Sequence, residues 1–366
     1  MKIRCHQQQR GIALVIVLIV IAILAVLAGN FAASMKVETI LARNASFDSE
    51  FEWLGRSGIE AARAVIADQK DQFTALNQKW AGGMGDTNGP FADFDLKHFP
   101  IGDTGRFVSI EIEDQERYFN INVANEMILG QAMTLIGVDA AQQSTIINSI
   151  LDWRDPNDDP MPGGAETSEY KSSAWLPHVA KNGPFDDMSE LLLVKGITEQ
   201  PQIYSKSFAQ SGASLISRHS RLGASKFEQV AYETTLTDLF STLSSRTLNV
   251  NTAGQKALQV LHPAISDEIA NAIISGVGGR NGPDGAPNTE DDTPFRNVQE
   301  LNRVQLLAPL LTDPSIRDQI FRWCGVQSII FKVTVKVDLG GMTRTYHALL
   351  RKMSARDTQM LCMDWD

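Results

Sequence analysis

The chain has 366 residues and a formal net charge of −10 at pH 7. A chain this acidic is poorly suited to phosphate backbones, so nucleic acid is not expected as a partner. Roughly 330 residues follow the apolar N-terminal segment, which is enough for two globular domains with cores of their own.

The N-terminal segment from Gly11 to Met35 contains no charged residue. A membrane-spanning helix needs roughly 20 apolar residues, so the segment is long enough to cross a bilayer. The leader is basic at Lys2, Arg4 and Arg10, which places the N-terminus in the cytoplasm and the rest of the chain across the membrane. Small residues at 32–34 leave conventional signal cleavage open, although the apolar run is longer than such a signal requires.

Apolar residues recur at near-helical spacing between Glu38 and Lys79, with charged residues between them. This periodicity predicts that the membrane helix continues as one long rod. The glycine-rich stretch Gly82–Pro90 is predicted to break it.

Two segments alternate between apolar and polar residues, as half-buried strands do. The first is Arg106–Asn122, which predicts a strand followed by a turn and a second strand at Gln115–Ile121. The second is Ile329–Lys352, which predicts a hairpin with Gly340 and Gly341 at its turn. These elements predict a long helix packed on an antiparallel sheet, with about 200 residues of mostly helical pattern inserted between the strands.

The insertion contains an internal repeat. Phe119–Asp155 is followed by Pro184–Thr198, and Leu248–Gly276 is followed by Pro294–Val304. Both units begin with an Asn-x-Asn turn, continue through two apolar-periodic helices and resume with Pro-Phe before a third helix. The arrangement resembles a tandem helix-hairpin-helix array.

An acidic loop rich in glycine and proline follows the second helix of each unit, at Asp152–Tyr170 and Gly278–Asp292. Calcium prefers carboxylate and carbonyl oxygens on flexible loops, although neither loop fits the EF-hand pattern. A calcium site and a plain solvated loop both remain open from the residues alone. The candidate ligands in the first loop are Asp152, Asp155, Asp158, Asp159, Glu166 and Glu169. The weaker candidates in the second loop are Asp284, Glu290, Asp291 and Asp292.

The leader resembles that of type IV pilin-like proteins, in which a short basic segment and a glycine precede a helix that stays on the mature protein. The resemblance implies that a prepilin peptidase cuts between Gly11 and Ile12 and that the new N-terminus is methylated. Most members carry Glu at the fifth mature position, where this chain has Ile16. The minor pseudopilin K family of type II secretion lacks that Glu in the same way, as suits a filament tip where no earlier subunit presents an amine.

The resemblance to this family covers nearly the whole chain, including the acidic loop before "PFDDMSELLLVKGI". It implies a subunit that caps the secretion pseudopilus, initiates its assembly and takes part in export of folded proteins through the outer membrane. The implied partners are minor pseudopilins I and J, other pseudopilus subunits and the prepilin peptidase. The implied location is the inner membrane, with one pass and a periplasmic globular part. Calcium binding through the first loop is implied as well.

The sequence therefore predicts an α+β fold, in which a transmembrane helix packs on a pilin-like antiparallel sheet that carries an inserted α-helical domain with two repeats. The predicted parts are a prepilin leader (1–11), a transmembrane helix (12–35), a pilin-like helix with the first strands (36–122), the inserted domain (123–325) and the closing strands (326–366).

Other functions are less well supported by the residues. A membrane-anchored, competence-type DNA receptor would use glycine-rich hairpins, which neither repeat offers, and a minor type IV pilin would share the leader. The histidines are scattered and no catalytic motif is present, so the chain is not expected to be an enzyme. After leader cleavage Cys324 and Cys362 would remain, and their pairing is left open.

Overall fold

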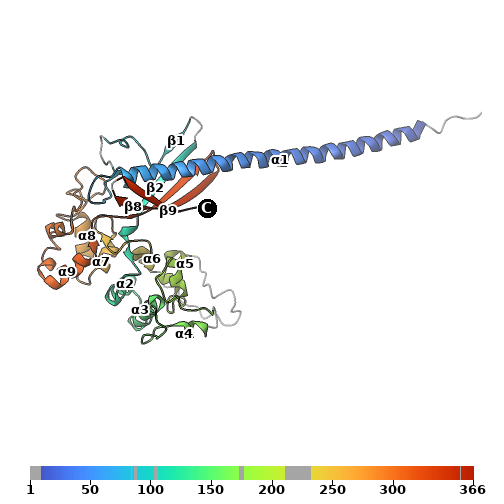
Figure 1. The fold of residues 1–366 in the computed structure, drawn as a ribbon. Helices are drawn as coiled ribbons and strands as arrows, with labels where there is room; N and C mark the ends of the chain where they lie inside the picture. Colours follow the sequence, from blue (N-terminus) through green and yellow to red (C-terminus); the bar gives the residue numbers. More distant parts are fainter. Residues whose placement is uncertain are drawn as a thin grey trace, which may run out of the picture.

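The computed structural model describes residues 10–83, 85, 89–102, 106–172, 177–210, 232–354 and 356–366. A long helix, α1 (Arg10–Ala67), lies with its C-terminal part on one face of a sheet, and a helical domain is attached to that sheet (Figure 1). The predicted α+β fold, with a long helix packed on an antiparallel sheet and a large helical insertion, is confirmed.

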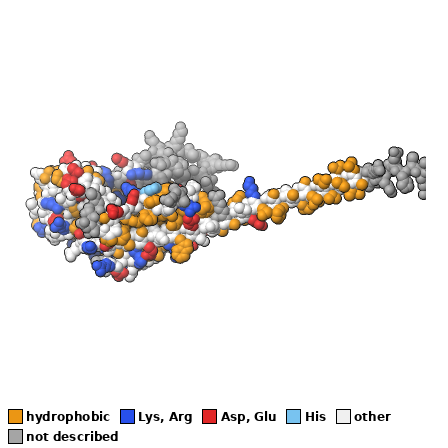
Figure 2. All heavy atoms as spheres, turned by 90° about the horizontal axis from the view of Figure 1, so that it is seen from above, with side chains coloured by type: hydrophobic (Ala, Val, Ile, Leu, Met, Phe, Trp, Pro, Cys, Tyr) orange, Lys and Arg blue, Asp and Glu red, His pale blue; other side chains and the backbone are white. Residues whose placement is uncertain are grey.

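Most of α1 projects beyond the globular part of the molecule, and hydrophobic side chains cover that projecting part (Figure 2). Among the described residues, α1 is the one helix that is both long enough and apolar enough to cross a membrane. The helix ends at Ala67 and not at Lys79 as the periodicity predicted. The chain after Ala67 is instead held by tertiary contacts, because Thr74 N donates to Val326 O at 2.7 Å and Lys352 Nζ donates to Gln69 O at 3.1 Å.

The sheet has five antiparallel strands in the order β1-β2-β7-β8-β9. Their bounds are β1 (Phe99–Ile101), β2 (Arg106–Asp114), β7 (Ile330–Asp338), β8 (Thr343–Ser354) and β9 (Asp357–Trp365). The predicted strand from Arg106 and the β7–β8 hairpin are confirmed. Val108, Ile110 and Ile112 are buried while Glu111 is exposed, which is the alternation that the sequence contains.

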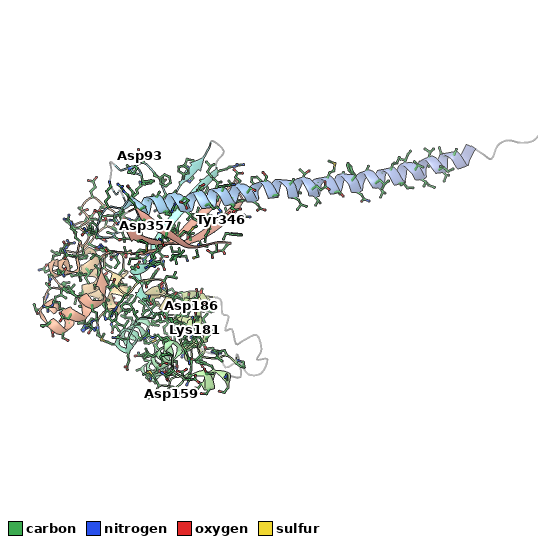
Figure 3. The ribbon with its side chains drawn as sticks, in the orientation of Figure 1. Asp93, Asp159, Lys181, Asp186, Tyr346 and Asp357 are labelled. Atoms are coloured by element: carbon green, nitrogen blue, oxygen red, sulfur yellow. The ribbon has the colours of Figure 1, made fainter. Side chains whose placement is uncertain are left out.

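Two glycines of α1 let the helix lie close to the sheet. A Cβ atom on Gly55 would lie 2.5 Å from Cε2 of Tyr346, and one on Gly58 would lie 2.5 Å from Cγ1 of Val335. Tyr346 is labelled in Figure 3, beside α1. Around this contact a hydrophobic core forms from α1, β2, β7 and β8, separate from the core of the insertion.

The predicted second strand at Gln115–Ile121 is wrong as a hairpin partner of β2. The side chain of Asp114 accepts the N–H of Glu116 and caps a short 3₁₀ helix, η2 (Gln115–Arg117), which leads the chain out of the sheet. The strand that follows, β3 (Phe119–Asn120), pairs in parallel with β4 (Phe240–Ser241), far along the chain. A similar parallel pair joins β5 (Leu248–Asn249) and β6 (Cys324–Gly325).

The insertion is mostly helical. Its α-helices are α2 (Glu126–Ile136), α3 (Ala140–Arg154), α4 (Thr167–Lys171), α5 (Lys206–Gln210), α6 (Leu236–Leu239), α7 (Gln255–Val260), α8 (Asp267–Ser275) and α9 (Pro314–Trp323). Its 3₁₀ helices are η3 (Met188–Leu193), η4 (Pro201–Ile203), η5 (Val298–Arg303) and η6 (Leu310–Thr312), and η1 (Lys79–Ala81) lies before the sheet.

The two sequence repeats are also two structural repeats, held by the same side-chain clamp. In the first repeat the amide of Asn122 donates to Phe185 O and accepts from Phe185 N, at 2.9 and 2.7 Å. In the second repeat Asn251 makes the same two bonds to Phe295, both at 2.8 Å. The second Asn of each Asn-x-Asn turn therefore fixes the Pro-Phe segment that resumes after the acidic loop.

An arginine completes each clamp. Arg154 donates to the carbonyls of Ile121 and Ala124, and Arg280 donates to Val250 O and Ala253 O at 2.7 and 2.8 Å. Each arginine stands at the start of its acidic loop. It therefore anchors that loop to the turn at the beginning of its own repeat.

The cysteine pairing that the sequence left open is not formed. Cys324 is buried in β6 of the insertion, Cys362 is exposed on β9 of the sheet, and both thiols are free. The two residues belong to different parts of the fold, so a bond between them would require those parts to move together.

Candidate metal centre

The end of α3 and the start of α4 bring three carboxyl groups of the first acidic loop together. Asp152 lies in the last turn of α3, Asp155 is its C-terminal capping residue, and Glu166 is the N-terminal capping residue of α4. One carboxylate oxygen from each lies within 4.8 Å of the others. Residues that are eleven or more positions apart in sequence, such as Asp155 and Glu166, therefore face a common point.

Glu166 is the least satisfied group of the three. Its side chain is buried, and neither carboxylate oxygen has a hydrogen-bond partner. Burial raises the pKa of Glu166 to about 7, and the negative charges of Asp152, Asp155, Asp158 and Glu169 add to that rise. A buried carboxylate without a partner is costly unless a cation or a proton neutralises it.

The backbone of the loop is shaped around Asp152. Met161 N donates to both carboxylate oxygens of Asp152, each at 3.2 Å. A Cβ atom on Gly164 would overlap Oδ2 of Asp152, so only glycine allows the loop to lie this close. Gly163 has a φ of +80°, a conformation that glycine adopts without strain.

Side chains outside the loop hold it in place. Lys195 Nζ donates to Gly164 O at 3.1 Å, and Asn148 Nδ2 donates to Pro162 O at 2.8 Å. Within the loop, the ring centroids of Trp153 and Tyr170 lie 5.5 Å apart. The sequence pattern gave no signal for Lys195, because it lies beyond the Pro-Phe segment and reaches the loop only through the fold.

The other three candidates of the first loop lie outside the group of three. The side chain and then the backbone N–H of Thr167 hydrogen-bond to Asp158 and lower its pKa. Glu169 accepts the N–H of Glu166. Asp159 is exposed and is labelled at the outer end of the insertion in Figure 3. Nearby, Lys181 forms an ion pair with Asp186 at 2.7 Å.

The second loop satisfies its carboxylates with protein donors. Asp291 accepts the N–H of Asp284 at 3.1 Å, Asp292 accepts the N–H of Asn288 at 2.8 Å, and Thr289 Oγ1 donates to Asp291 at 2.8 Å. Glu290 belongs to no carboxylate group of this kind among the described residues.

The residue after the clamp arginine also differs between the repeats. Asp155 follows Arg154, whereas Asn281 follows Arg280 and donates to Ser275 and Gly285 O, both at 3.2 Å. The second repeat therefore has an amide donor where the first has a carboxylate.

The first loop fits a hard divalent cation. Calcium takes six to eight oxygen ligands from carboxylates, carbonyls and water. Asp152, Asp155 and Glu166 would supply three negatively charged ligands, and the cation would neutralise the unpartnered Glu166. Such an ion would join the end of α3 to the start of α4.

Known proteins resemble this chain in sequence. Residues 109–205 match the family model described as Type II secretion system, protein K. A relative from Escherichia coli K12 that carries the name of type II secretion system protein K is 26% identical over 210 residues, which are 53% of this chain and 60% of the relative. Type II secretion system protein K from Klebsiella pneumoniae is 25% identical over 210 residues, 52% of this chain and 59% of its own length. The alignments thus span about 60% of the curated relatives.

The fold is similar to that of a chain in the solved GspK–GspI–GspJ complex from the type 2 secretion system of enterotoxigenic Escherichia coli. The TM-score is 0.61, with 18% sequence identity, over 89% of this chain and 99% of the other. At this identity the likeness is one of fold. Together, these matches confirm the resemblance to type II secretion protein K that the sequence predicts.

Proposed function

We propose that this relative of type II secretion protein K is a minor pseudopilin that caps the tip of the secretion pseudopilus. In this proposal α1 anchors it in the inner membrane and the sheet and insertion lie in the periplasm. The apolar helix that projects from the globular part supports the anchor. The protein K resemblance supports the pathway, with minor pseudopilins I and J as partners in initiating assembly and exporting folded proteins.

The position of the insertion in the fold is the main support for the proposed location at the filament tip. The chain leaves the sheet at Asp114 and returns at Ile330, and these residues lie at the end of β2 and the start of β7. Phe107 pairs with Asp338 at the opposite end of these two strands. At that end Arg106 forms an ion pair with Glu50 of α1, on the side of the membrane segment. A bulky insertion at the end of the sheet away from the membrane segment supports a place at the filament tip, where no further subunit has to stack.

The tip assignment is tested by locating the subunit on filaments. The full chain is given an epitope tag, produced with the other pseudopilins, and detected by immunogold electron microscopy. Gold at filament ends supports a cap, and gold distributed along the shaft contradicts it. Ile16→Glu, which restores the carboxylate usual in shaft subunits, should not move the label into the shaft, and Ile16→Leu is the matched control.

We further propose that calcium occupies the first acidic loop. The unpartnered, buried Glu166 supports this proposal most strongly. A ligand that binds only the folded state adds RT ln(1 + [L]/Kd), about 2.7 kcal/mol at a hundredfold excess over Kd. The full chain in detergent should therefore unfold at a higher temperature in calcium than in chelator. Magnesium should substitute poorly, because it requires tighter octahedral geometry.

Two variants make the calcium test specific. Glu166→Gln should remove most of the shift in unfolding temperature caused by calcium. Asp159→Asn changes an exposed carboxylate of the same loop outside the group of three, so it should leave the shift nearly unchanged. Identical unfolding curves of the wild type in calcium and in chelator would contradict the site.

The expectation that the chain is not an enzyme stays a prediction. The matched family is a component of a secretion system, which gives no support to a catalytic role. The DNA-receptor alternative is not favoured by the same matches.

A further inference from the structure

The insertion is joined to the sheet through a buried polar cluster, here called the joint. It comprises Asp114 and Glu116, where the chain leaves the sheet, and the residues that pack against them. Asp114 is 2% exposed and Glu116 is 0% exposed. Figure 1 shows the start of the insertion at the end of β2, so this cluster lies where the two parts of the molecule meet.

Asp114 collects hydrogen bonds from both parts. One oxygen accepts the N–H of Glu116 at 2.9 Å. The other accepts from the hydroxyls of Ser328 at 2.7 Å and Thr252 at 2.5 Å, and from the amide of Asn249 at 3.3 Å. Since Thr252 and Asn249 belong to the second repeat and Ser328 precedes β7, this single carboxyl group ties the repeat to the sheet.

Glu116 links the same two parts through backbone groups. One of its carboxyl oxygens accepts the N–H of Ser245 at 3.2 Å, and the other accepts the N–H of Ile330 at 3.1 Å. The N–H of Glu116 donates to Asp114, so the two buried acidic residues belong to the same cluster.

In the described part of the chain, the hydrogen bonds to the pair come from hydroxyl, amide and backbone N–H groups. Lys97 and Arg117 line the pocket beside Asp114. No ion pair in the described part of the chain includes Asp114 or Glu116, and Arg117 pairs instead with Glu113 at 3.6 Å. Arg246, next to Ser245, lies over the ring of Trp323.

Among the described residues, the joint therefore contains two acidic groups that form no ion pair with a cation. Burial in such a place disfavours two negative charges side by side. Accordingly, burial and then the charge of Asp114 raise the pKa of Glu116 to about 8, and burial raises the pKa of Asp114.

We propose that one proton, held between Asp114 and Glu116, is a structural component of the joint, and that the attachment of the insertion to the sheet loosens when this proton is lost. The inference goes beyond the proposed secretion function. It concerns the fold of this chain whatever filament or partner the chain serves.

The direction of the pH effect follows from the two pKa values of Glu116. The ordinary value of 4.5 applies when the joint is open, and a value of about 8 applies when it is closed. At pH values between these two pKa values, the closed joint binds one more proton than the open joint. The equilibrium constant for closing therefore falls by up to tenfold for each pH unit of rise. The stabilisation of the closed joint by this proton is complete below about pH 4.5 and is lost as the pH rises to about 8.

The test is hydrogen exchange of the full chain in detergent. The N–H groups of Ser245 and Ile330 donate directly to Glu116, so their protection reports on the closed joint. After correction for the intrinsic exchange rate, protection should fall by up to tenfold per pH unit between about pH 5 and 8. The N–H of Val335, within the sheet, serves as the internal reference.

Glu116→Gln removes the titrating group. Its amide cannot accept both backbone N–H bonds, so protection should drop overall, but its pH dependence in this window should disappear. Glu113→Gln, on the same segment and partly exposed, should keep the dependence of the wild type. A further readout is the infrared band of protonated carboxyl groups at neutral pH, which should be weaker in Glu116→Gln than in the wild type because Glu166 still contributes to it.

Wild-type protection at Ser245 and Ile330 that does not change with pH in this window would overturn the proposal. An unchanged carboxyl band in Glu116→Gln would overturn it as well. If Glu116→Gln does not fold, the pH dependence of the wild type still decides, because the sheet amide separates opening of the joint from unfolding of the whole chain.

Discussion

Replacement of Gly55 by Ala measures how closely α1 must approach the sheet. In an isolated helix this change is favourable by about 1 kcal/mol, because glycine loses more backbone entropy than alanine. Here the added Cβ would lie 2.5 Å from Cε2 of Tyr346, a side chain that is 1% exposed. Overpacking of a filled core typically costs about 1–3 kcal/mol.

The packing cost should outweigh the gain in helix propensity, so we expect a net loss of roughly 1–2 kcal/mol. Gly58→Ala should act in the same direction, since its Cβ would lie 2.5 Å from Val335. Gly130→Ala is the matched control, because Gly130 lies within α2 and its Cβ would be 3.9 Å from Ile147, an ordinary contact. That variant should be more stable than the wild type by about 1 kcal/mol.

Scanning calorimetry of the full chain in detergent, at constant calcium, checks these signs. A loss of 1 kcal/mol shifts the unfolding temperature of a domain of 150–250 residues by about 2–4 °C. Gly55→Ala and Gly58→Ala should unfold several degrees below the wild type and Gly130→Ala above it. If Gly55→Ala were as stable as Gly130→Ala, the close approach of α1 to Tyr346 would be refuted.

Three further predictions concern the clamp, the metal loop and the leader. Asn122→Ala and Asn251→Ala should each destabilise the chain by about 1–3 kcal/mol, measured by denaturant unfolding, because each leaves a Phe N–H and carbonyl without a buried partner. In chelator Glu166→Gln should unfold at a higher temperature than the wild type, because it removes a buried charge that has no partner; a lower temperature would contradict that reading. Gly11→Val should leave full-length precursor in the membrane, as mass spectrometry can show, whereas mature protein beginning after residue 34 would favour ordinary signal cleavage.

Local periodicity predicted the elements whose surroundings are also local. The buried and exposed alternation of β2 and the β7–β8 hairpin are properties of short segments, and both are confirmed. The end of α1 was misplaced because apolar spacing continues past Ala67, while the backbone is drawn away by partners such as Val326. The segment after Asp114 was misread because its strand partner, β4, lies far along the chain.

In the candidate site, too, the sequence predicted the local features and missed those that depend on the tertiary structure. Composition indicated an acidic loop, but only the fold distinguishes Glu166, which is buried without a partner, from Asp158, which accepts a backbone N–H. Asp152 is selected because the backbone at Gly164 folds over it. Lys195 reaches the loop through tertiary structure alone, so no sequence pattern could have included it.

The parallel pair β3–β4 has a consequence for how this architecture changes over evolutionary time. Because Phe119 lies beside Phe240 and Asn120 beside Ser241, the segment from Phe119 to Phe240, which contains the first repeat, begins and ends at neighbouring points. It is a closed module, and its removal or replacement would leave two chain ends that already lie together. The segment from Leu248 to Cys324, which contains the second repeat, has the same property, because β5 pairs with β6. Units of this kind can be gained, lost or exchanged whole while the membrane helix and its sheet keep their geometry.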